Sequence, residues 1–213
     1  PAKRVEIWKK FDIYPRGIDR EIVEIMHRTH IGVDNDYLHL ILQGLRASLA
    51  DGWGGSMIAT ELQDVMFGTP SPTFSEANQG VLEPNQVNII VHGHEPLLSE
   101  MIVAAAADPE MVEQAKKQGA VGINVAGMCC TGNEVLMRHG VPVAGNFLQQ
   151  ELAVATGAVE AMVVDIQCIM PALGALTGCF HTKFISTSPK AKFPGATHME
   201  FHEETAIQTA KAI

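Results

Sequence analysis

Residues 87–94 read Val-Asn-Ile-Ile-Val-His-Gly-His, a short β-branched apolar run that ends in a glycine between two histidines. Strand-like runs recur further along the chain, at 121–125, 141–143, 161–166 and 183–186. Helical stretches separate them, at 96–107, 109–118, 132–139, 147–156, from Pro171 onward and at 204–213. Strands that are apolar almost throughout and alternate with helices predict an α/β fold, in which a parallel sheet carries helices on both faces.

The residues before this region read as helices. Apolar residues recur at helical spacing between 17 and 29, and Asp34-Asn35-Asp36 is placed to cap a second helix. A third helix is expected over 57–66, after which Gly68-Thr69-Pro70-Ser71-Pro72 breaks the pattern. We therefore expect a helical segment over residues 1–84, followed by a Rossmann-like α/β domain over residues 85–213.

The composition indicates a folded protein that binds no nucleic acid. Apolar residues make up 46% of the 213 residues and charged residues 18%, which suffices for a large core. The net charge is −9, and no basic stripe offers a surface to nucleic acid. We find neither an apolar run long enough for a membrane helix nor a signal peptide at the start, so the expected location is the cytoplasm.

Three of the expected strands are followed by residue types that bind metals. His92-Gly93-His94 follows the first, Gly127-Met128-Cys129-Cys130 the second, and Gln167-Cys168 the third clear strand. Because sites form at the carboxyl ends of parallel strands, we expect an imidazole and two thiolates to meet at one edge of the sheet. The alternative stays open at this point, because single cysteines and histidines in such places are often core or structural residues.

Cys129 and Cys130 stand at the start of a predicted helix, where backbone N–H groups favour the thiolate, the form that binds metals. The other candidates are expected to be structural, in the core, at a helix end or at the surface: Cys179, His139, His181, His198 and His202.

Several common sites are excluded because their motifs are missing. No G-x-G-x-x-G follows a strand, and neither G-x-S-x-G nor C-x-x-C occurs. Three nitrogen and sulfur ligands suit an open zinc site, or part of an iron–sulfur or mixed-metal cluster whose other ligands lie elsewhere.

Three longer stretches resemble the anaerobic nickel-containing carbon monoxide dehydrogenases. They are Val-His-Gly-His-Glu-Pro at 91–96, Gly-Met-Cys-Cys-Thr-Gly-Asn-Glu at 127–134 and Val-Val-Asp-Ile-Gln-Cys-Ile-Met-Pro at 163–171. The likeness runs through the whole chain and is strongest to the catalytic subunit of acetogens, which partners acetyl-CoA synthase in anaerobic carbon fixation. It implies reversible oxidation of CO with water to CO2, two protons and two electrons at a Ni-Fe-S cluster.

The resemblance also implies which residues bind the cluster. His94 and Cys130 would bind the iron that lies outside the NiFe3S4 unit, and Cys168 would bind an iron within it. Cys129 would be a neighbouring or alternative ligand. The choice of Cys130 over Cys129 follows from how its spacings to His94 and Cys168 match those of the family.

The family's remaining cluster ligands and its further 4Fe-4S clusters have no match here, so the chain resembles the middle part of the subunit. Because three ligands cannot hold the whole cluster, we expect the isolated chain to have no CO oxidation activity. Ferredoxin as electron acceptor and a homodimer are the implied partners. Two alternatives remain: a hybrid-cluster (hydroxylamine reductase) protein, and a metal-free α/β scaffold or interaction module.

Overall fold

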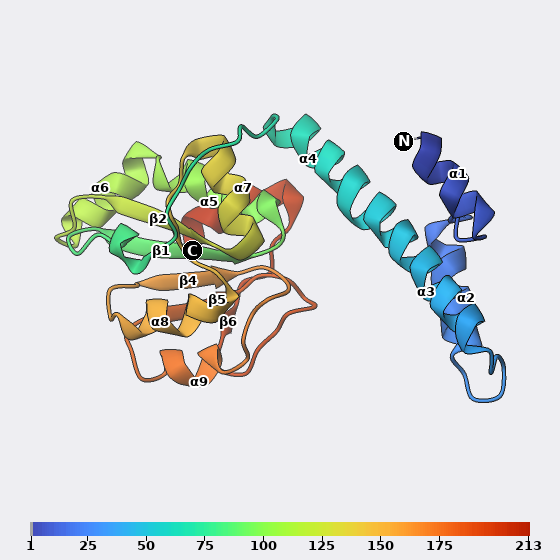
Figure 1. Cartoon of the computed structure of the whole chain (residues 1–213). Coiled ribbons are helices and arrows are strands. Elements are labelled where there is room, and N and C mark those ends of the chain that lie inside the picture. The colour runs from blue at the N-terminus through green and yellow to red at the C-terminus, as the bar shows by residue number, and fades with distance from the viewer. Residues whose placement is uncertain (1) are drawn as a thin grey trace. The chain divides into compact units, whose positions relative to one another are not determined.

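The computed structural model describes residues 2–213, which form two compact units that divide between Gly68 and Thr69 (Figure 1). We call them the helical unit and the α/β unit and describe each by itself. Within 2–213, we find no helix with the length and apolar character needed to cross a membrane.

The α/β unit is built on a six-stranded sheet whose paired strands are all parallel. Its strands are β1 (Val87–Gly93), β2 (Ile123–Met128), β3 (Val143–Gly145), β4 (Ala161–Val164), β5 (Lys183–Ser186) and β6 (Thr197–His198). Their order across the sheet is β3-β2-β1-β4-β5-β6, which is the Rossmann order, with the direction of winding reversed between β1 and β4. The predicted α/β class is confirmed.

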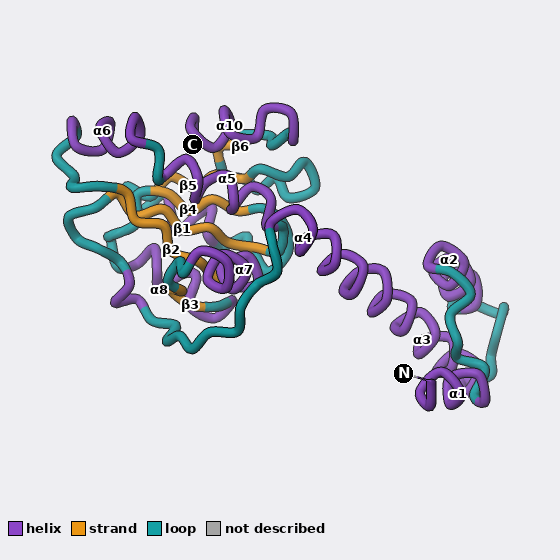
Figure 2. Tube along the Cα trace, turned by 90° about the horizontal axis from the view of Figure 1, so that it is seen from above, coloured by secondary structure: helices purple, strands orange, loops and turns teal. Residues whose placement is uncertain are grey.

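Helices cover both faces of this sheet (Figures 1 and 2). They are α5 (Pro96–Ala106), α6 (Pro109–Lys117), α7 (Cys129–His139), α8 (Gln150–Ala155), α9 (Leu173–Thr177) and α10 (Ala206–Ala212). Successive strand residues face opposite sides, so Ile90 packs in one apolar cluster with Leu173 of α9. Val91 packs in the other cluster, with Ile102 of α5 and Val135 of α7. Burial on both faces explains why the strands are apolar almost throughout.

Of the predicted strands, only β5 has the expected bounds, since β1 continues to Gly93, β3 lies at Val143–Gly145 and not at 141–143, and β4 ends at Val164. β2 begins at Ile123 and not at Val121, because the backbone N–H of Val121 bonds to Asn85 O outside the sheet. At its other end β2 continues to Met128, which pairs in register with His92 of β1. The short strand β6 was not predicted, since two residues are too few to show any alternation of apolar and polar side chains.

The polar loop 69–84 lies with the α/β unit and not, as its sequence suggested, with the helical segment. Its backbone is tied to the sheet region at two points, since Ser71 N bonds to Met137 O and Asn78 N bonds to Val143 O. The side chain of Val81 packs against the apolar cluster on the α8 and α9 side. These long-range contacts cannot be read from the local composition of the loop.

The helical unit contains α1 (Ala2–Lys10), α2 (Ile18–Arg28), α3 (Tyr37–Asp51) and α4 (Ala59–Phe67). The carboxylate of Asp36 accepts hydrogen bonds from the backbone of Leu38 and His39 and so caps α3, as the sequence predicted. A π-helical stretch, Gly52–Ile58, joins α3 to α4, so these elements form one continuous helix where separate helices were expected (Figure 2).

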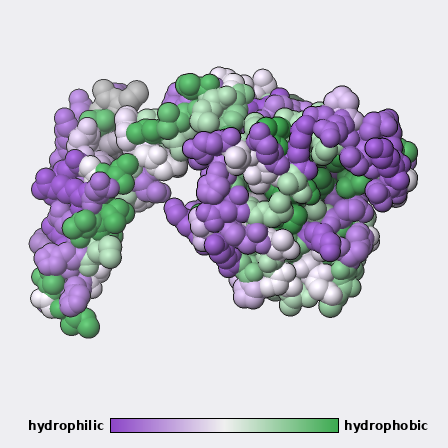
Figure 3. Space-filling view, turned by 180° about the vertical axis from the view of Figure 1, so that it is seen from behind, coloured by the Kyte–Doolittle hydropathy of each residue, from purple (hydrophilic) through white to green (hydrophobic). Residues whose placement is uncertain are grey.

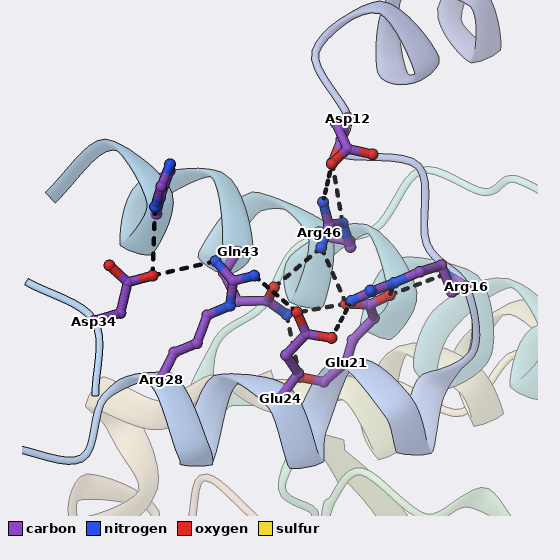
Figure 4. Close-up of polar contacts among 9 residues, drawn as sticks. Asp12, Arg16, Glu21, Glu24, Arg28, Asp34, Gln43 and Arg46 are labelled. Carbon is purple, nitrogen blue, oxygen red and sulfur yellow. Dashed lines mark hydrogen bonds and ion pairs between the residues drawn. The ribbon is translucent and has the colours of Figure 1, made fainter. Parts of the chain in front are cut away.

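The interior of the helical unit is polar (Figure 4). The buried carboxylate of Glu21 accepts hydrogen bonds from Arg16 Nε and Nη2 at 2.9 Å each, and from Gln43 Nε2 at 2.9 Å. The buried guanidinium of Arg46 donates to Gln43 Oε1 at 3.1 Å and to the backbone oxygen of Asp12. The hydrogen bonds from Arg16 hold the pKa of Glu21 at about 2, well below its ordinary value.

Candidate metal centre

The candidate centre lies at the carboxyl ends of β1, β2 and β4, which are neighbours in the sheet. His94 directly follows β1, Cys130 is the second residue of α7 after β2, and Cys168 lies in the loop after β4. The winding of the sheet reverses between β1 and β4, and ligands of open α/β sheets bind at such a point. The topology therefore brings the three predicted ligands to the same edge.

The side chains of these residues meet there. His94 Nε2 lies 3.4 Å from Cys130 Sγ and 4.0 Å from Cys168 Sγ. In the sequence, Cys130 and Cys168 are 36 and 74 residues away from His94, so only the folded sheet brings them together. Both thiols are free and exposed, which leaves them open to bind a metal or cluster.

The backbone around the thiols adopts unusual conformations. Three residues at this site other than glycine have positive φ angles: Cys129 at 58°, Gln167 at 64° and Cys168 at 53°. Each such residue costs about 1–3 kcal/mol and persists only where the surroundings enforce it, most often at functional sites. The loop after β4 has two of them in succession, which turns Cys168 back toward the imidazole.

The two adjacent cysteines have different surroundings. Cys130 is exposed, and its sulfur contacts the imidazole of His94. Cys129 is half-buried and packs against the apolar cluster on the α8 and α9 side of the sheet. This geometry favours Cys130 over Cys129 as a ligand and leaves Cys129 beside the centre.

The expected preference for thiolates at the start of α7 is wrong for the protein without metal. Burial raises the pKa of Cys129 to about 11, and the neighbouring thiols of Cys168 and Cys130 add to the effect. Cys130 is exposed at its surface but partly desolvated, and this desolvation, followed by the nearby Cys168 and Glu134, also raises its pKa. The charge of a bound metal would reverse this balance, because a coordinated thiol is deprotonated.

His94, Cys130 and Cys168 could supply part of the ligand set of a metal cluster. An imidazole nitrogen and thiolate sulfurs are ligands of iron–sulfur and mixed-metal centres. Within residues 2–213, no three His, Cys, Asp or Glu side chains converge as a site for one metal ion. Cys130 and Cys168 instead lie at different distances from His94, an arrangement compatible with ligands that bind different metals of one cluster.

Sequence reasoning missed the side chains that support the loop of Cys168. The buried amide of Gln150 donates to Cys168 O at 3.3 Å and accepts from Met170 N at 2.9 Å. Its oxygen also lies 3.1 Å from Nε2 of His92, a fully buried residue whose pKa is lowered by burial. A glutamine on an amphipathic helix gives no signal in the sequence that it is buried against a loop.

The other candidates occupy varied surroundings. Cys179 was expected in the core and is exposed instead, because it follows the short helix α9 on the outside of the unit. His139 ends α7 as expected, and its Nε2 also pairs with the buried Glu100. The side chains of His181 and His202 are exposed as predicted. His198 is only partly exposed, because its Nδ1 lies 3.0 Å from Ser186 Oγ.

A Rossmann-type sheet with an imidazole and two thiols beside its switch point defines an α/β protein with a candidate metal centre. Comparison with known proteins gives the family. The Prismane/CO dehydrogenase family matches the chain over residues 1–213, and the chain belongs to this family.

Known relatives share the sequence and the fold over the whole chain. Carbon monoxide dehydrogenase 1 of Methanosarcina mazei is 72% identical over 213 residues, which are all of this chain and 34% of that protein. A nickel-free crystal structure of carbon monoxide dehydrogenase from Thermococcus sp. AM4 is 60% identical, with a TM-score of 0.96 over 100% of this chain and 34% of that one. The chain thus spans about a third of the length of these relatives.

A third comparison involves a larger assembly. It is a structure of acetyl-CoA synthase/carbon monoxide dehydrogenase, described as having NiZn[Fe4S4] and NiNi[Fe4S4] clusters in its alpha subunits. The similar chain is 50% identical, with a TM-score of 0.94, and the match covers 100% of this chain and 31% of that one.

Proposed function

We propose that this chain is part of a carbon monoxide dehydrogenase, which oxidises CO with water to CO2, two protons and two electrons. In this proposal His94, Cys130 and Cys168 hold part of a Ni-Fe-S cluster. The observation that supports it most is the approach of His94 Nε2 to both sulfurs, at 3.4 and 4.0 Å, in a chain that belongs to the Prismane/CO dehydrogenase family.

The residues of this chain would bind and orient the cluster. When bound, the cluster supplies the redox chemistry by which CO is oxidised. His94 would bind through Nε2, the nitrogen that faces the two sulfurs. Cys130 and Cys168 would bind as thiolates, and each would release its proton on binding, because a coordinated thiol is deprotonated. Cys129 would stay beside the cluster and contribute packing.

The partners of the whole protein are part of the same proposal. The similarity to a chain of an acetyl-CoA synthase/carbon monoxide dehydrogenase assembly supports acetyl-CoA synthase as a partner. Ferredoxin as electron acceptor, a homodimer with further 4Fe-4S clusters, and a cytoplasmic location complete it.

Anaerobic reconstitution of the chain with iron and sulfide tests the proposal. We expect iron to bind to the unmodified chain and to be lost from a variant with both Cys130→Ala and Cys168→Ala. Cys179→Ala is the matched control, since Cys179 is also a free, exposed thiol. No iron in the unmodified chain, or iron that stays equal in all three proteins, would contradict the proposed ligands and favour an α/β scaffold without a specific metal site.

Two further measurements separate the remaining alternatives. Nickel that binds in addition to iron supports a carbon monoxide dehydrogenase, whereas iron without nickel in the complete, active protein favours a hybrid-cluster hydroxylamine reductase. We expect no CO oxidation with a viologen acceptor by the 213-residue chain alone, because three ligands cannot hold a whole cluster. Appreciable turnover by this chain would overturn that expectation.

A further inference from the structure

The carboxylate of Asp165 connects the three loops that carry the proposed ligands. Asp165 directly follows β4 and is 4% exposed. Its Oδ1 accepts a hydrogen bond from the backbone N–H of His94 at 2.6 Å, and its Oδ2 accepts one from the hydroxyl of Thr131 at 2.8 Å. The backbone N–H of Ile166, in the carboxylate's own loop, donates to Oδ1 as well.

Each of these donors is a proposed ligand or lies within two residues of one. One is the backbone of His94 itself, and Thr131 directly follows Cys130. Ile166 begins the short loop in which Cys168 takes its positive φ. A carboxylate is costly to bury unless hydrogen bonds satisfy it, so the three donors and the acceptor hold one another in place.

A glycine on the neighbouring strand makes room for this carboxylate. A Cβ atom on Gly93 would lie 1.8 Å from Asp165 Oδ1, which is far inside van der Waals contact. Gly93 also has a φ of 133°, a conformation that other residues rarely adopt. The strand before His94 is thus shaped to let Asp165 reach the backbone of His94, which is an observation independent of the hydrogen bonds.

We propose that Asp165 is a positioning residue of the metal centre: its carboxylate ties the loops of β1, β2 and β4 together and thereby sets the imidazole of His94 against the thiols of Cys130 and Cys168. This inference rests on the proposed function, because it takes these three residues as ligands. Groups that orient metal ligands typically change metal affinity by 10- to 100-fold when they are removed.

Thr131 offers a mild way to test this role. Thr131→Val removes one hydrogen bond to Asp165 and keeps the shape of a fully buried side chain, whereas Thr131→Ser keeps the hydroxyl. The matched control is Thr182→Val, since Thr182 is 5% exposed and its hydroxyl donates to Val159 O at 2.7 Å. Thr182 precedes β5 and Val159 precedes β4, so both lie at the amino ends of the strands, away from the candidate centre at the carboxyl ends.

The experiment is an anaerobic titration of the full chain with Co2+, followed through the thiolate-to-cobalt absorption bands. We expect Thr131→Val to weaken Co2+ binding about tenfold and to shift the bands, while Thr131→Ser binds as the unmodified chain does. Thr182→Val should lower the melting temperature by a similar amount and leave both the affinity and the spectrum unchanged. Asp165→Asn, which keeps the shape and one acceptor oxygen, should weaken binding at least as much as Thr131→Val.

The outcomes distinguish this inference from the function on which it rests. If Cys130→Ala abolishes Co2+ binding and Thr131→Val binds as Thr182→Val does, the positioning role is refuted and the ligands stand. If Cys130→Ala binds Co2+ as tightly as the unmodified chain, the proposed ligands are wrong and the positioning role is refuted with them.

Discussion

The two units of this chain bury opposite kinds of side chain. In the α/β unit, two apolar clusters fill the space between the sheet and its helices. In the part of the helical unit that the structure describes, Ala50 is the only buried apolar residue, and the others that are buried are Glu21, Gln43 and Arg46. One unit is held by apolar packing, the other by a network of charges and hydrogen bonds.

This difference explains the surface of the helical unit. Apolar residues lie at the surface of this unit, as the green areas in the left-hand part of Figure 3 show. Among the exposed ones are Met26 at 70%, Tyr37 at 77% and Val65 at 84% exposure. A helix with exposed apolar residues gains little from packing within the unit, so its stability rests on its polar contacts. The α/β unit should therefore respond to changes in packing, and the helical unit to changes in charge and pH.

The largest effect is expected for Gly93→Ala in the α/β unit. The added Cβ would meet Asp165 Oδ1 at 1.8 Å, and the φ of 133° is unfavourable for alanine. Backbone strain and overpacking together should lower the free energy of unfolding by about 4 kcal/mol. Gly157→Ala is the control, since Gly157 also has a positive φ of 69° but open space around it, and it should cost about 1 kcal/mol. Equal losses in urea denaturation would show that the contact with Asp165 is unimportant.

In the helical unit, Glu21→Gln should have the next largest effect. The neutral amide removes the buried negative charge that Arg16 and Arg46 share, and leaves them only Glu24 and Asp12 as carboxylate partners, which should cost about 3 kcal/mol. Amide hydrogen exchange should then become faster in α2 and α3 and stay unchanged in the strands. Glu61→Gln, at an exposed position, is the control and should change neither region. Faster exchange in the sheet as well would mean that the two units do not respond separately.

Acid should act on the helical unit through the same residue. The folded pKa of Glu21 is about 2 and thus below its value of 4.5 in an unfolded chain, so the unfolded state binds more protons between these values. The stabilisation is therefore complete above pH 4.5 and is lost as the pH falls toward 2. Hydrogen-exchange protection of α2 and α3 should decline over this range. In Glu21→Gln this decline should be smaller, and an equal decline would assign it to other groups.

The smallest effect is expected for Asp34→Asn, at the edge of the polar network. Asp34 lies 3.3 Å from the guanidinium of Arg28, which is itself partly exposed and also pairs with Glu24. Ion pairs in such places contribute about 0–1 kcal/mol, so thermal unfolding should shift only slightly. A loss comparable to that of Glu21→Gln would show that the network extends to its exposed edge.

The α/β fold could be predicted from the sequence because buried parallel strands carry a direct signal, the apolar runs at 87–91 and 161–166. The residue types after these strands also pointed to His94, Cys130 and Cys168, whose side chains approach one another in the structure. The contacts of Asp165 and Gln150 could not be predicted, since they depend on which loops the folded sheet brings together.

Two properties of the thiols, the pKa of Cys129 and the exposure of Cys179, also could not be predicted from the sequence. The raised pKa of Cys129 follows from burial and from neighbours distant in the chain, whereas the sequence showed only its place at the start of a helix. Cys179 is exposed because the short helix α9 ends just before it at the surface, and cysteine composition alone favours burial.

Anomalous diffraction from crystals of the chain grown with Zn2+ would show whether His94, Cys130 and Cys168 belong to one metal centre. We predict a zinc peak bonded to His94 Nε2 and Cys130 Sγ, at about 2.0–2.1 Å and 2.3 Å, with Cys168 beside it or bound to it. Zinc peaks only at other places on the chain, with the three side chains free of metal, would contradict a shared metal centre.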